Sequence, residues 1–170
     1  MVAIFAFKCR TCGEIHEGSP SFSFDAPWPY AGLTDEQRKR ARLTADFCEI
    51  AHDQGVDHFI RTVLEIPIHA VEEPFVWGVW VSLSEQSYRR YLETWDEPDE
   101  QDAWFGWFSN RLPYYPDTIN LKTRVRPRTG GNRPHLELER SGHPLAEHQS
   151  CGLSVMLAQE IAEHAAHMSG

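Results

Sequence analysis

Two cysteines near the amino terminus have the spacing of a metal-binding turn, in the segment Cys9-Arg10-Thr11-Cys12-Gly13. A Cys-x-x-Cys turn after a strand places two thiolates on one side of a tight loop, at a separation that suits tetrahedral zinc. The glycine that follows permits a positive φ, which lets backbone amides approach the sulfurs. No His-Glu-x-x-His or His-x-Glu pattern supplies a water-activating partner. The turn therefore predicts half of a structural zinc site that holds one ion.

The remaining ligands must come from other parts of the chain. We rank Cys48 first because it opens a predicted strand close in sequence, and His16 second because it lies four residues after the pair. Cys151 ranks third because it sits beside a helical glycine, and the fourth ligand stays open between His16 and Cys151. Five other histidines share no ligand spacing and are expected at the surface: His135, His143, His148, His164 and His167.

Two other interpretations of the cysteine turn stay open. A redox dithiol normally opens a helix whose N-terminus lowers the thiol pKa, whereas Gly13 and charged residues follow here, which disfavours that chemistry. The second interpretation is a pair of free surface thiols with no metal, which is plausible because the sequence contains only one such pair.

Composition and charge restrict the class of protein. The chain has 170 residues, 41% hydrophobic and 24% charged, which is typical of one globular domain. No run approaches the roughly 18 apolar residues that span a bilayer, and no secretory leader is recognisable. With four cysteines and no export signal, we expect a cytoplasmic location without disulfides. The net charge of −9 opposes the phosphate backbone and disfavours nucleic-acid binding.

Hydrophobic patterning predicts a single α+β domain over residues 1–170, with a mainly antiparallel sheet, flanking helices and an N-terminal zinc-knuckle-like turn. The turn occupies residues 1–20, a mixed α/β body 21–143, and a C-terminal helix, interrupted near Gly152, residues 144–167. A capping box that begins at Thr34 predicts a helix to about Leu43. The other expected elements are a helix over 85–95 and strands over 2–8, 47–51, 57–68, 75–83, 121–128 and 135–139.

Alternation along two of these strands assigns one face of each to the core, with Ile60, Leu64, Ile66 and Ile68 on the first and Phe75, Trp77, Val79, Val81 and Leu83 on the second. Arg61, Glu65 and Trp80 fall on the opposite faces, where pairing would bring a cation, a carboxylate and an aromatic ring together. This group could form a small pocket. The alternative is an ion pair covered by a helix that packs on the sheet.

A row of cations marks another strand, because Lys122 and Arg124, followed by Arg126 and Arg128, alternate with uncharged residues. One face of that strand would then attract an anion or an acidic partner. The alternative is a solvated strand whose charges protect a sheet edge from aggregation.

Six segments in combination are similar to one bacterial family, the domain of unknown function 2199, over about Phe7 to Ile161: Cys9-x-x-Cys12-Gly13-x-x-His16, Phe24-Asp25-Ala26-Pro27, Phe59 to Pro67, Trp77 to Ser84, Leu112 to Pro116 and Leu121-Lys122-Thr123. The resemblance implies one domain in a bacterial cytoplasm and implies no particular reaction. The family pattern includes the histidine at position 16 and a cysteine near position 48, which implies a Cys3His metal site.

We therefore expect a zinc-binding module that is not an enzyme and that engages a protein partner through an acidic, aromatic-rich surface. An immunity protein that neutralises a basic toxin is one version of this hypothesis, since opposite charges speed association. The alternative is a small enzyme that acts on an anionic substrate through Arg61, Glu65 and Trp80. Nucleic-acid binding through the turn and the basic Lys122–Arg140 segment is the least favoured hypothesis.

Overall fold

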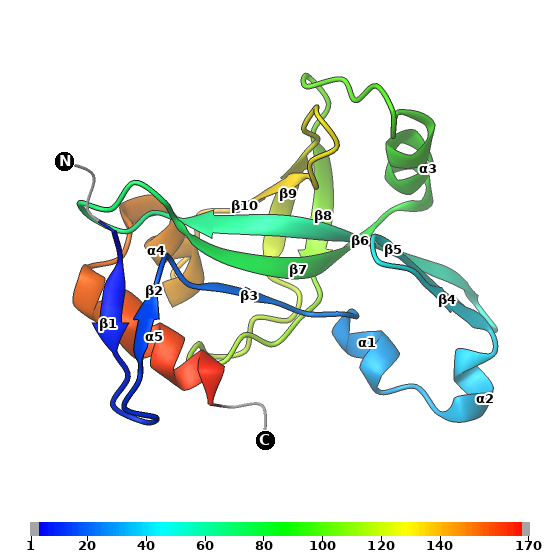
Figure 1. Ribbon diagram of the computed structural model, residues 1–170. Helices are drawn as coiled ribbons and strands as arrows, with labels where there is room; N and C mark the ends of the chain where they lie inside the picture. Colours follow the sequence, from blue (N-terminus) through cyan, green and yellow to red (C-terminus); the bar gives the residue numbers. More distant parts are fainter. Residues whose placement is uncertain (1–3, 168–170) are drawn as a thin grey trace.

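A computed structural model describes residues 4–167 and shows one α+β domain (Figure 1). In this range a small hairpin is formed by β1 (Ala6–Lys8) and β2 (Ile15–Glu17). A larger sheet contains β3 (Ser21–Ser23), β4 (Ala41–Leu43), β5 (Phe47–His52), β6 (Gly55–Ile66), β7 (Phe75–Leu83), β8 (Trp104–Phe108), β9 (Lys122–Arg126) and β10 (His135–Leu138). The helices of the described residues are α1 (Trp28–Ala31), α2 (Asp35–Arg38), α3 (Glu85–Glu93), α4 (Pro144–Cys151) and α5 (Val155–Ala166).

The larger sheet closes on itself, which the sequence did not predict. Its strand order is β3-β7-β8-β9-β10-β6-β5-β4, and β6 also pairs with β7, so strands β6 to β10 form a ring. Most pairs are antiparallel, as expected, while β3–β7 and β10–β6 are parallel. The long strand β6 extends beyond the ring and pairs with β5, which pairs with β4, so that these strands form an arm (Figure 1).

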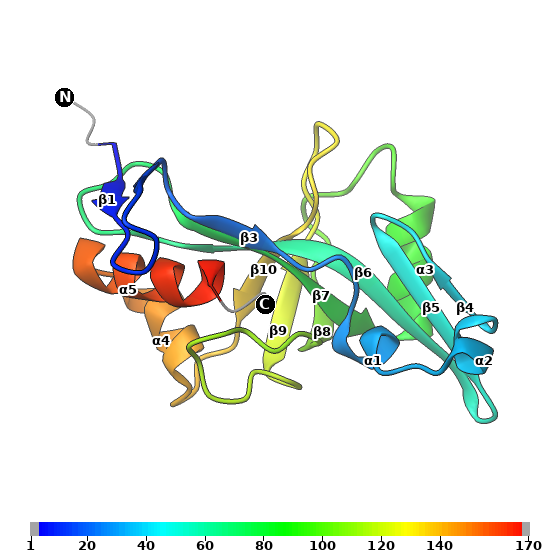
Figure 2. The same ribbon diagram turned by 60° about the horizontal axis from the view of Figure 1, so that its bottom comes forward.

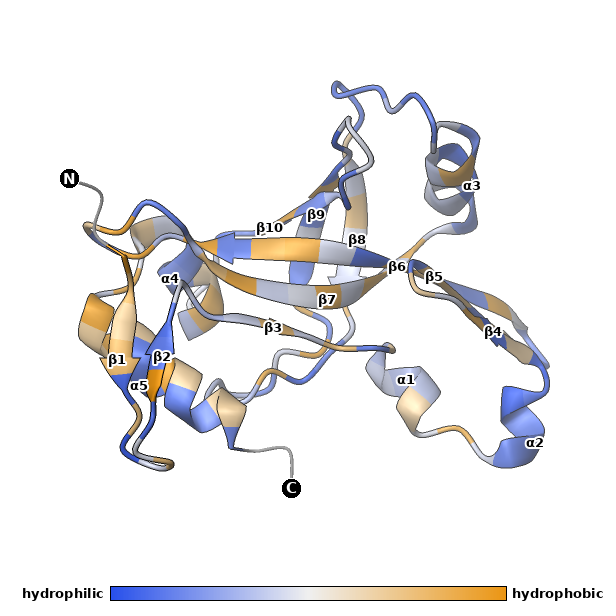
Figure 3. Ribbon diagram, in the orientation of Figure 1, coloured by the Kyte–Doolittle hydropathy of each residue, from blue (hydrophilic) through white to orange (hydrophobic). Residues whose placement is uncertain are grey.

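The main core lies along β6 and β7, whose inward faces are those that alternation predicted. Their pairing runs from His58 opposite Leu83 to Ile66 opposite Phe75, which keeps the apolar parities of both strands on one side. Figure 3 shows the resulting hydrophobic segments on both strands. The predicted inward residues are all buried in one cluster: Ile60, Leu64, Ile66, Ile68, Phe75, Trp77, Val79, Val81 and Leu83. Each large side chain buried in this way contributes about 1.5–3 kcal/mol.

A second, smaller core lies on the face of β5, β6 and β7 that is opposite the main core. It consists of Cys48, Ile50, Phe59 and Trp80, with Phe24, Tyr30 of α1, Leu33 and two residues of β4 packed around it. β7 is therefore buried on both faces where Trp80 lies. The face of β6 and β7 opposite the main core, predicted to be mixed, is therefore buried as a core at this point.

The capping-box prediction is correct for the start of its helix and wrong for its end. Thr34 accepts from the Gln37 amide and Gln37 caps the Thr34 amide, as expected, but α2 ends at Arg38. Residues 41–43, which we had assigned to the helix, form β4 and pair with β5. Tertiary pairing overrides helix propensity in this short segment.

The C-terminal segment forms two helices that separate at Gly152, as the glycine signal indicated. Gly152 has φ of 81°, and an added Cβ there would lie 2.8 Å from the His69 ring, so glycine is required. Leu153 then forms a bridge with Ile68, which fixes where α5 begins. Within residues 4–167, none of the helices combines the length and the apolar character that a bilayer span requires. The predicted first strand, residues 2–8, is observed over Ala6–Lys8; residues 1–3 and 168–170 lie outside the described range.

Candidate metal centre

The β1–β2 hairpin holds the two cysteines at its tip. Phe7 pairs with His16, and the turn between the strands is closed by hydrogen bonds from the Cys9 amide to Glu14 O (2.8 Å) and from the Gly13 amide to Cys9 O (2.9 Å). Gly13 has φ of 76°, the positive value expected for a glycine that closes such a turn. The tight turn brings Cys9 and Cys12 close together.

The C-terminal helix brings a histidine to this pair. The ligating atoms of Cys9, Cys12 and His167 all lie within 4.8 Å of one another, and His167 Nε2 is 3.2 Å from Cys9 Sγ. Metal–ligand bonds of about 2.0–2.3 Å in a tetrahedral zinc site place ligand atoms about 3.3–3.8 Å apart, so the side chains are near the spacing that zinc requires. These three residues form the group of possible ligands within residues 4–167.

A fourth candidate ligand, His16, stands on the exposed side of the group. Its Nε2 atom is 3.4 Å from Cys12 Sγ, and its ring packs on Phe7 with ring centroids 5.2 Å apart. The aromatic contact limits how the imidazole can turn. His16 therefore lies beside Cys12, outside the group of three residues whose ligating atoms are all within 4.8 Å of one another.

Polar contacts join the turn to α5 beside the possible ligands. The Arg10 backbone amide and Nε both donate to the Glu163 carboxylate, at 3.2 and 3.3 Å, and Gln159 donates to Glu163 at 3.0 Å. Hydrogen bonding from Gln159, aided by the Arg10 contacts, lowers the pKa of Glu163. Figure 2 shows α5 running beside the hairpin.

The buried thiol at position 9 is stabilised as a thiolate. Hydrogen bonding from the Cys12 backbone amide, and then from that of Thr11, lowers the pKa of Cys9 to about 6, although burial opposes the shift. The nearby His167 and Cys12 side chains lower the pKa further. A thiolate is the form of cysteine that binds zinc, so the turn prepares one ligand in its binding state.

Cys48, the first-ranked additional ligand, does not reach this group. It lies on β5 in the second core with Ile50, Phe59 and Trp80, and burial raises its pKa to about 12. A fully buried, protonated thiol in apolar surroundings behaves as a small hydrophobic residue. Cys151 is also outside the group: it is exposed at the end of α4, and its carbonyl accepts from His69.

His167 was missed because the sequence analysis placed it at the surface. It is separated from Cys9 by 158 positions, and no local spacing reports a contact of that range. The only available signal was chemical: a cysteine pair needs more ligands, and histidine is the residue most able to supply them.

The structure does not bring Arg61, Glu65 and Trp80 into one pocket. Arg61 is the cross-strand partner of Trp80 and its guanidinium lies 6.0 Å from the indole ring, but Trp80 is fully buried and donates to Phe24 O. Glu65 pairs instead with Arg128, at 3.6 Å. Arg61 is held near Asp25 and Ala45 O, at 3.8 and 3.3 Å. Arg61 therefore lies beside Trp80, whereas the Glu65 carboxylate pairs with Arg128 and is not part of this group.

The cations of β9 alternate as the sequence predicted. Lys122 and Arg124 are exposed, whereas Thr123 and Val125 between them are buried. In the register of the ring, Lys122 lies opposite Trp107 and the next cation opposite Phe105 on β8. The outer face of β8 and β9 therefore combines exposed cations with exposed aromatic rings.

Comparison with known proteins gives one family. Residues 8–153 match the profile of the family described as "Uncharacterized protein conserved in bacteria (DUF2199)". No curated protein and no solved structure matches the chain. The matched range includes the cysteine turn and His16 and stops before His167.

Proposed function

The chain belongs to the bacterial family of domain of unknown function 2199, and we propose that it binds one structural zinc ion through Cys9, Cys12, His16 and His167. The observation that carries the proposal is the convergence of three ligating atoms within 4.8 Å from opposite ends of the described chain. His16, in contact with Cys12, supplies the fourth ligand. Two thiolates and two imidazoles form a donor set typical of structural zinc sites.

The ion would link the β1–β2 hairpin to α5. Short hairpins are marginally stable alone, and β1 and β2 have three residues each. A metal bound from both sides would convert neighbouring segments into one unit, because the binding free energy is available only when both are in place. Four protein ligands leave no open position for a reacting water, so the role of the ion is structural.

Metal analysis of the protein purified without added zinc tests this proposal. We expect about one zinc per chain in the wild type and a large loss in Cys12→Ser and His167→Ala. Matched controls are Cys151→Ser, an exposed thiol outside the group, and His164→Ala, one turn earlier on α5. Zinc retained by all four variants, or missing from the wild type, would exclude the site.

We propose a protein-interaction module as a second candidate function, on the basis of the outer face of β8 and β9. Phe105 and Trp107 are 45% and 41% exposed and pack edge to face, with centroids 4.8 Å apart. Aromatic residues of this kind are enriched at protein interfaces, and the nearby Lys122 and Arg124 favour an acidic patch on a cytoplasmic partner. The immunity-type version of this function requires a basic toxin, which would instead be attracted by the overall charge of −9.

A stoichiometric partner recovered with the wild type should be lost with Trp107→Ser. It should be retained with Met156→Ser, which changes an even more exposed apolar residue on α5. Equal loss with both variants would show that the outer face of β8 and β9 is not the binding surface. If association with that partner weakens with salt, an electrostatic contribution is present.

A further inference from the structure

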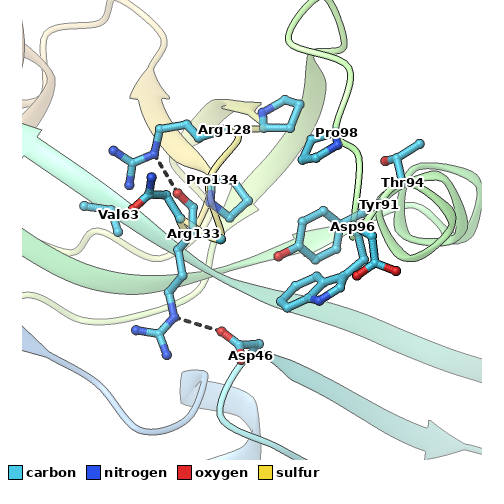
Figure 4. A pocket seen from close by; sticks show the side chains of 13 residues that line it. Asp46, Val63, Tyr91, Thr94, Asp96, Pro98, Arg128, Arg133 and Pro134 are labelled. Atoms are coloured by element: carbon cyan, nitrogen blue, oxygen red, sulfur yellow. Dashed lines mark hydrogen bonds and ion pairs between the residues drawn. The ribbon is translucent and has the colours of Figure 1, made fainter.

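A cleft of about 620 Å³ separates the end of α3 from the loop that joins β9 to β10. One wall carries Tyr91 and Pro98, and the other carries Arg128, Arg133 and Pro134 (Figure 4). Trp95 also lines the cleft and packs on Tyr91. Above the cleft the two walls contact each other, because the Thr129 hydroxyl lies 3.2 Å from Glu100 Oε1. The cleft is distinct from the metal centre, with which it shares no lining residue.

The α3 wall presents a fixed aromatic surface. Trp95 is 44% exposed, yet it packs edge to face on Phe47 and on Tyr91, with centroids 5.0 and 5.5 Å apart. An aromatic ring held on two sides loses little freedom when a ligand packs against it. Proline rings at Pro98 and Pro134 add apolar surface on both walls. Such a surface suits a flat ring.

The opposite wall presents two anchored guanidinium groups. Arg133 Nε donates to Asp46 Oδ1 at 2.9 Å, and Arg128 Nε donates to Arg133 O at 2.7 Å. Both arginines are held through Nε and keep N–H groups at their terminal nitrogens. Each also forms an ion pair, Arg133 with Asp46 at 2.9 Å and Arg128 with Glu65 at 3.6 Å, and the Arg128 head lies on the Val63 side of the cleft (Figure 4). Guanidinium groups fixed in this way bind carboxylates and phosphates well. Asp96 also lines the cleft, but it lies beyond Tyr91, on the side away from both arginines (Figure 4).

A third donor projects from the aromatic wall. Tyr91 is only 5% exposed, and its hydroxyl points across the cleft toward the wall of Arg133 and Pro134, with no hydrogen bond to another lining residue (Figure 4). Burial raises the pKa of Tyr91, so the hydroxyl stays protonated and able to donate. The hydroxyl is open to solvent in the cleft, since it is not one of the buried polar atoms without a partner, and a ligand oxygen can accept its proton in place of water.

We propose that this cleft binds a small planar anion, an aromatic ring that carries a carboxylate or a phosphate. The ring packs on Trp95 and between the prolines, while the oxyanion accepts from Tyr91 and from the terminal nitrogens of Arg128 and Arg133. The size of the cleft fits a single small molecule of this class.

Phenyl phosphate is a suitable probe, titrated into the full chain and followed by ¹H–¹⁵N NMR. We expect saturable shifts of the Trp95 indole N–H and of the Gly131 and Asn132 amides, which line the cleft. Inorganic phosphate and phenol each supply only half of the recognition, so each should bind at least about tenfold more weakly. Benzoate tests the carboxylate version in the same way.

Two variants remove single donors from the cleft. Tyr91→Phe and Arg128→Gln should each weaken phenyl phosphate binding by about tenfold or more, since hydrogen bonds to charged groups are stronger than those between neutral groups. The control is Arg124→Gln, an exposed arginine on β9 outside the cleft, which should leave binding unchanged. The proposal is overturned if no saturable shift occurs, if inorganic phosphate binds as tightly as phenyl phosphate, or if Arg124→Gln weakens binding as much as Arg128→Gln.

Discussion

The closed ring of β6 to β10 and the corner formed by the β1–β2 hairpin with α5 are stabilised in different ways. The ring encloses fully buried side chains such as Leu64, Trp77 and Phe108, so apolar packing holds it. In the corner, β1 and β2 are half exposed, Ile15 faces solvent, and most contacts of the turn with α5 are polar. Phe5 is its main apolar anchor. A region too small for its own core needs another kind of link, which here is the proposed metal.

The largest expected effect tests the ring. Phe108→Ala on β8 should lower the free energy of unfolding by about 3–5 kcal/mol, because it leaves a cavity in the main core. The control is Phe105→Ala on the same strand. Phe105 is 45% exposed, so the free energy of unfolding should fall by about 0.5 kcal/mol or less. Denaturant unfolding measures both. Equal losses would mean that the ring is not the centre of stability.

Removal of the metal should affect the corner and spare the ring. With a strong chelator, amide hydrogen exchange in the hairpin and at the end of α5 should accelerate about 100-fold, equivalent to about 3 kcal/mol of local stability. The β6 and β7 amides should keep their protection, since their core does not depend on the metal. Uniform loss across the protein, or no change in the hairpin, would contradict the contrast between the regions.

An intermediate effect is expected for Cys48→Ser. A hydroxyl placed in the second core should lower stability by about 1–3 kcal/mol, while the zinc content stays unchanged. In the wild type, iodoacetamide at pH 8 should label Cys151 and spare Cys48, whose pKa of about 12 leaves almost no thiolate. Labelling of Cys48 in the folded protein should rise only as the pH approaches that pKa. Loss of zinc in the variant would restore Cys48 as a ligand.

The smallest effect concerns the ion pair of the corner. Arg10→Ala removes a contact between a side chain that is 71% exposed and Glu163, so unfolding should change by less than about 1 kcal/mol. Because the Arg10 backbone amide also donates to Glu163, the corner keeps part of the link in the variant. A thermal-shift series in increasing salt would measure the effect, and a loss as large as that of Cys12→Ser would show that the ion pair, and not the metal, joins the two segments.

Sequence patterns predicted the features that depend on neighbouring residues. The inward faces of β6 and β7 follow from alternation, and the helix starts at Thr34 and Ser84 follow from side-chain capping of free amides. The break near Gly152 follows from the glycine itself. These signals are local, so one sequence is enough to interpret them.

Features that depend on distant contacts could not be predicted. Closure of the ring needs β10 to pair with β6, with His135 opposite Val63, and no pattern within either strand specifies that partner. The same limit applies to His167, which α5 carries back to Cys9. Cys48 was ranked as a ligand because it is close in sequence, whereas the pairing of β5 with β6 places it in a core.

The most direct test of the metal link is X-ray absorption spectroscopy at the zinc edge of the protein as purified. The proposed site predicts two sulfur neighbours at about 2.3 Å and two imidazole nitrogens at about 2.0–2.1 Å. In His167→Ala one nitrogen should be replaced or the ion lost, whereas His164→Ala should give the wild-type spectrum. A first shell without sulfur, or a spectrum that does not change in His167→Ala, would contradict the claim that one ion joins the two ends of the fold.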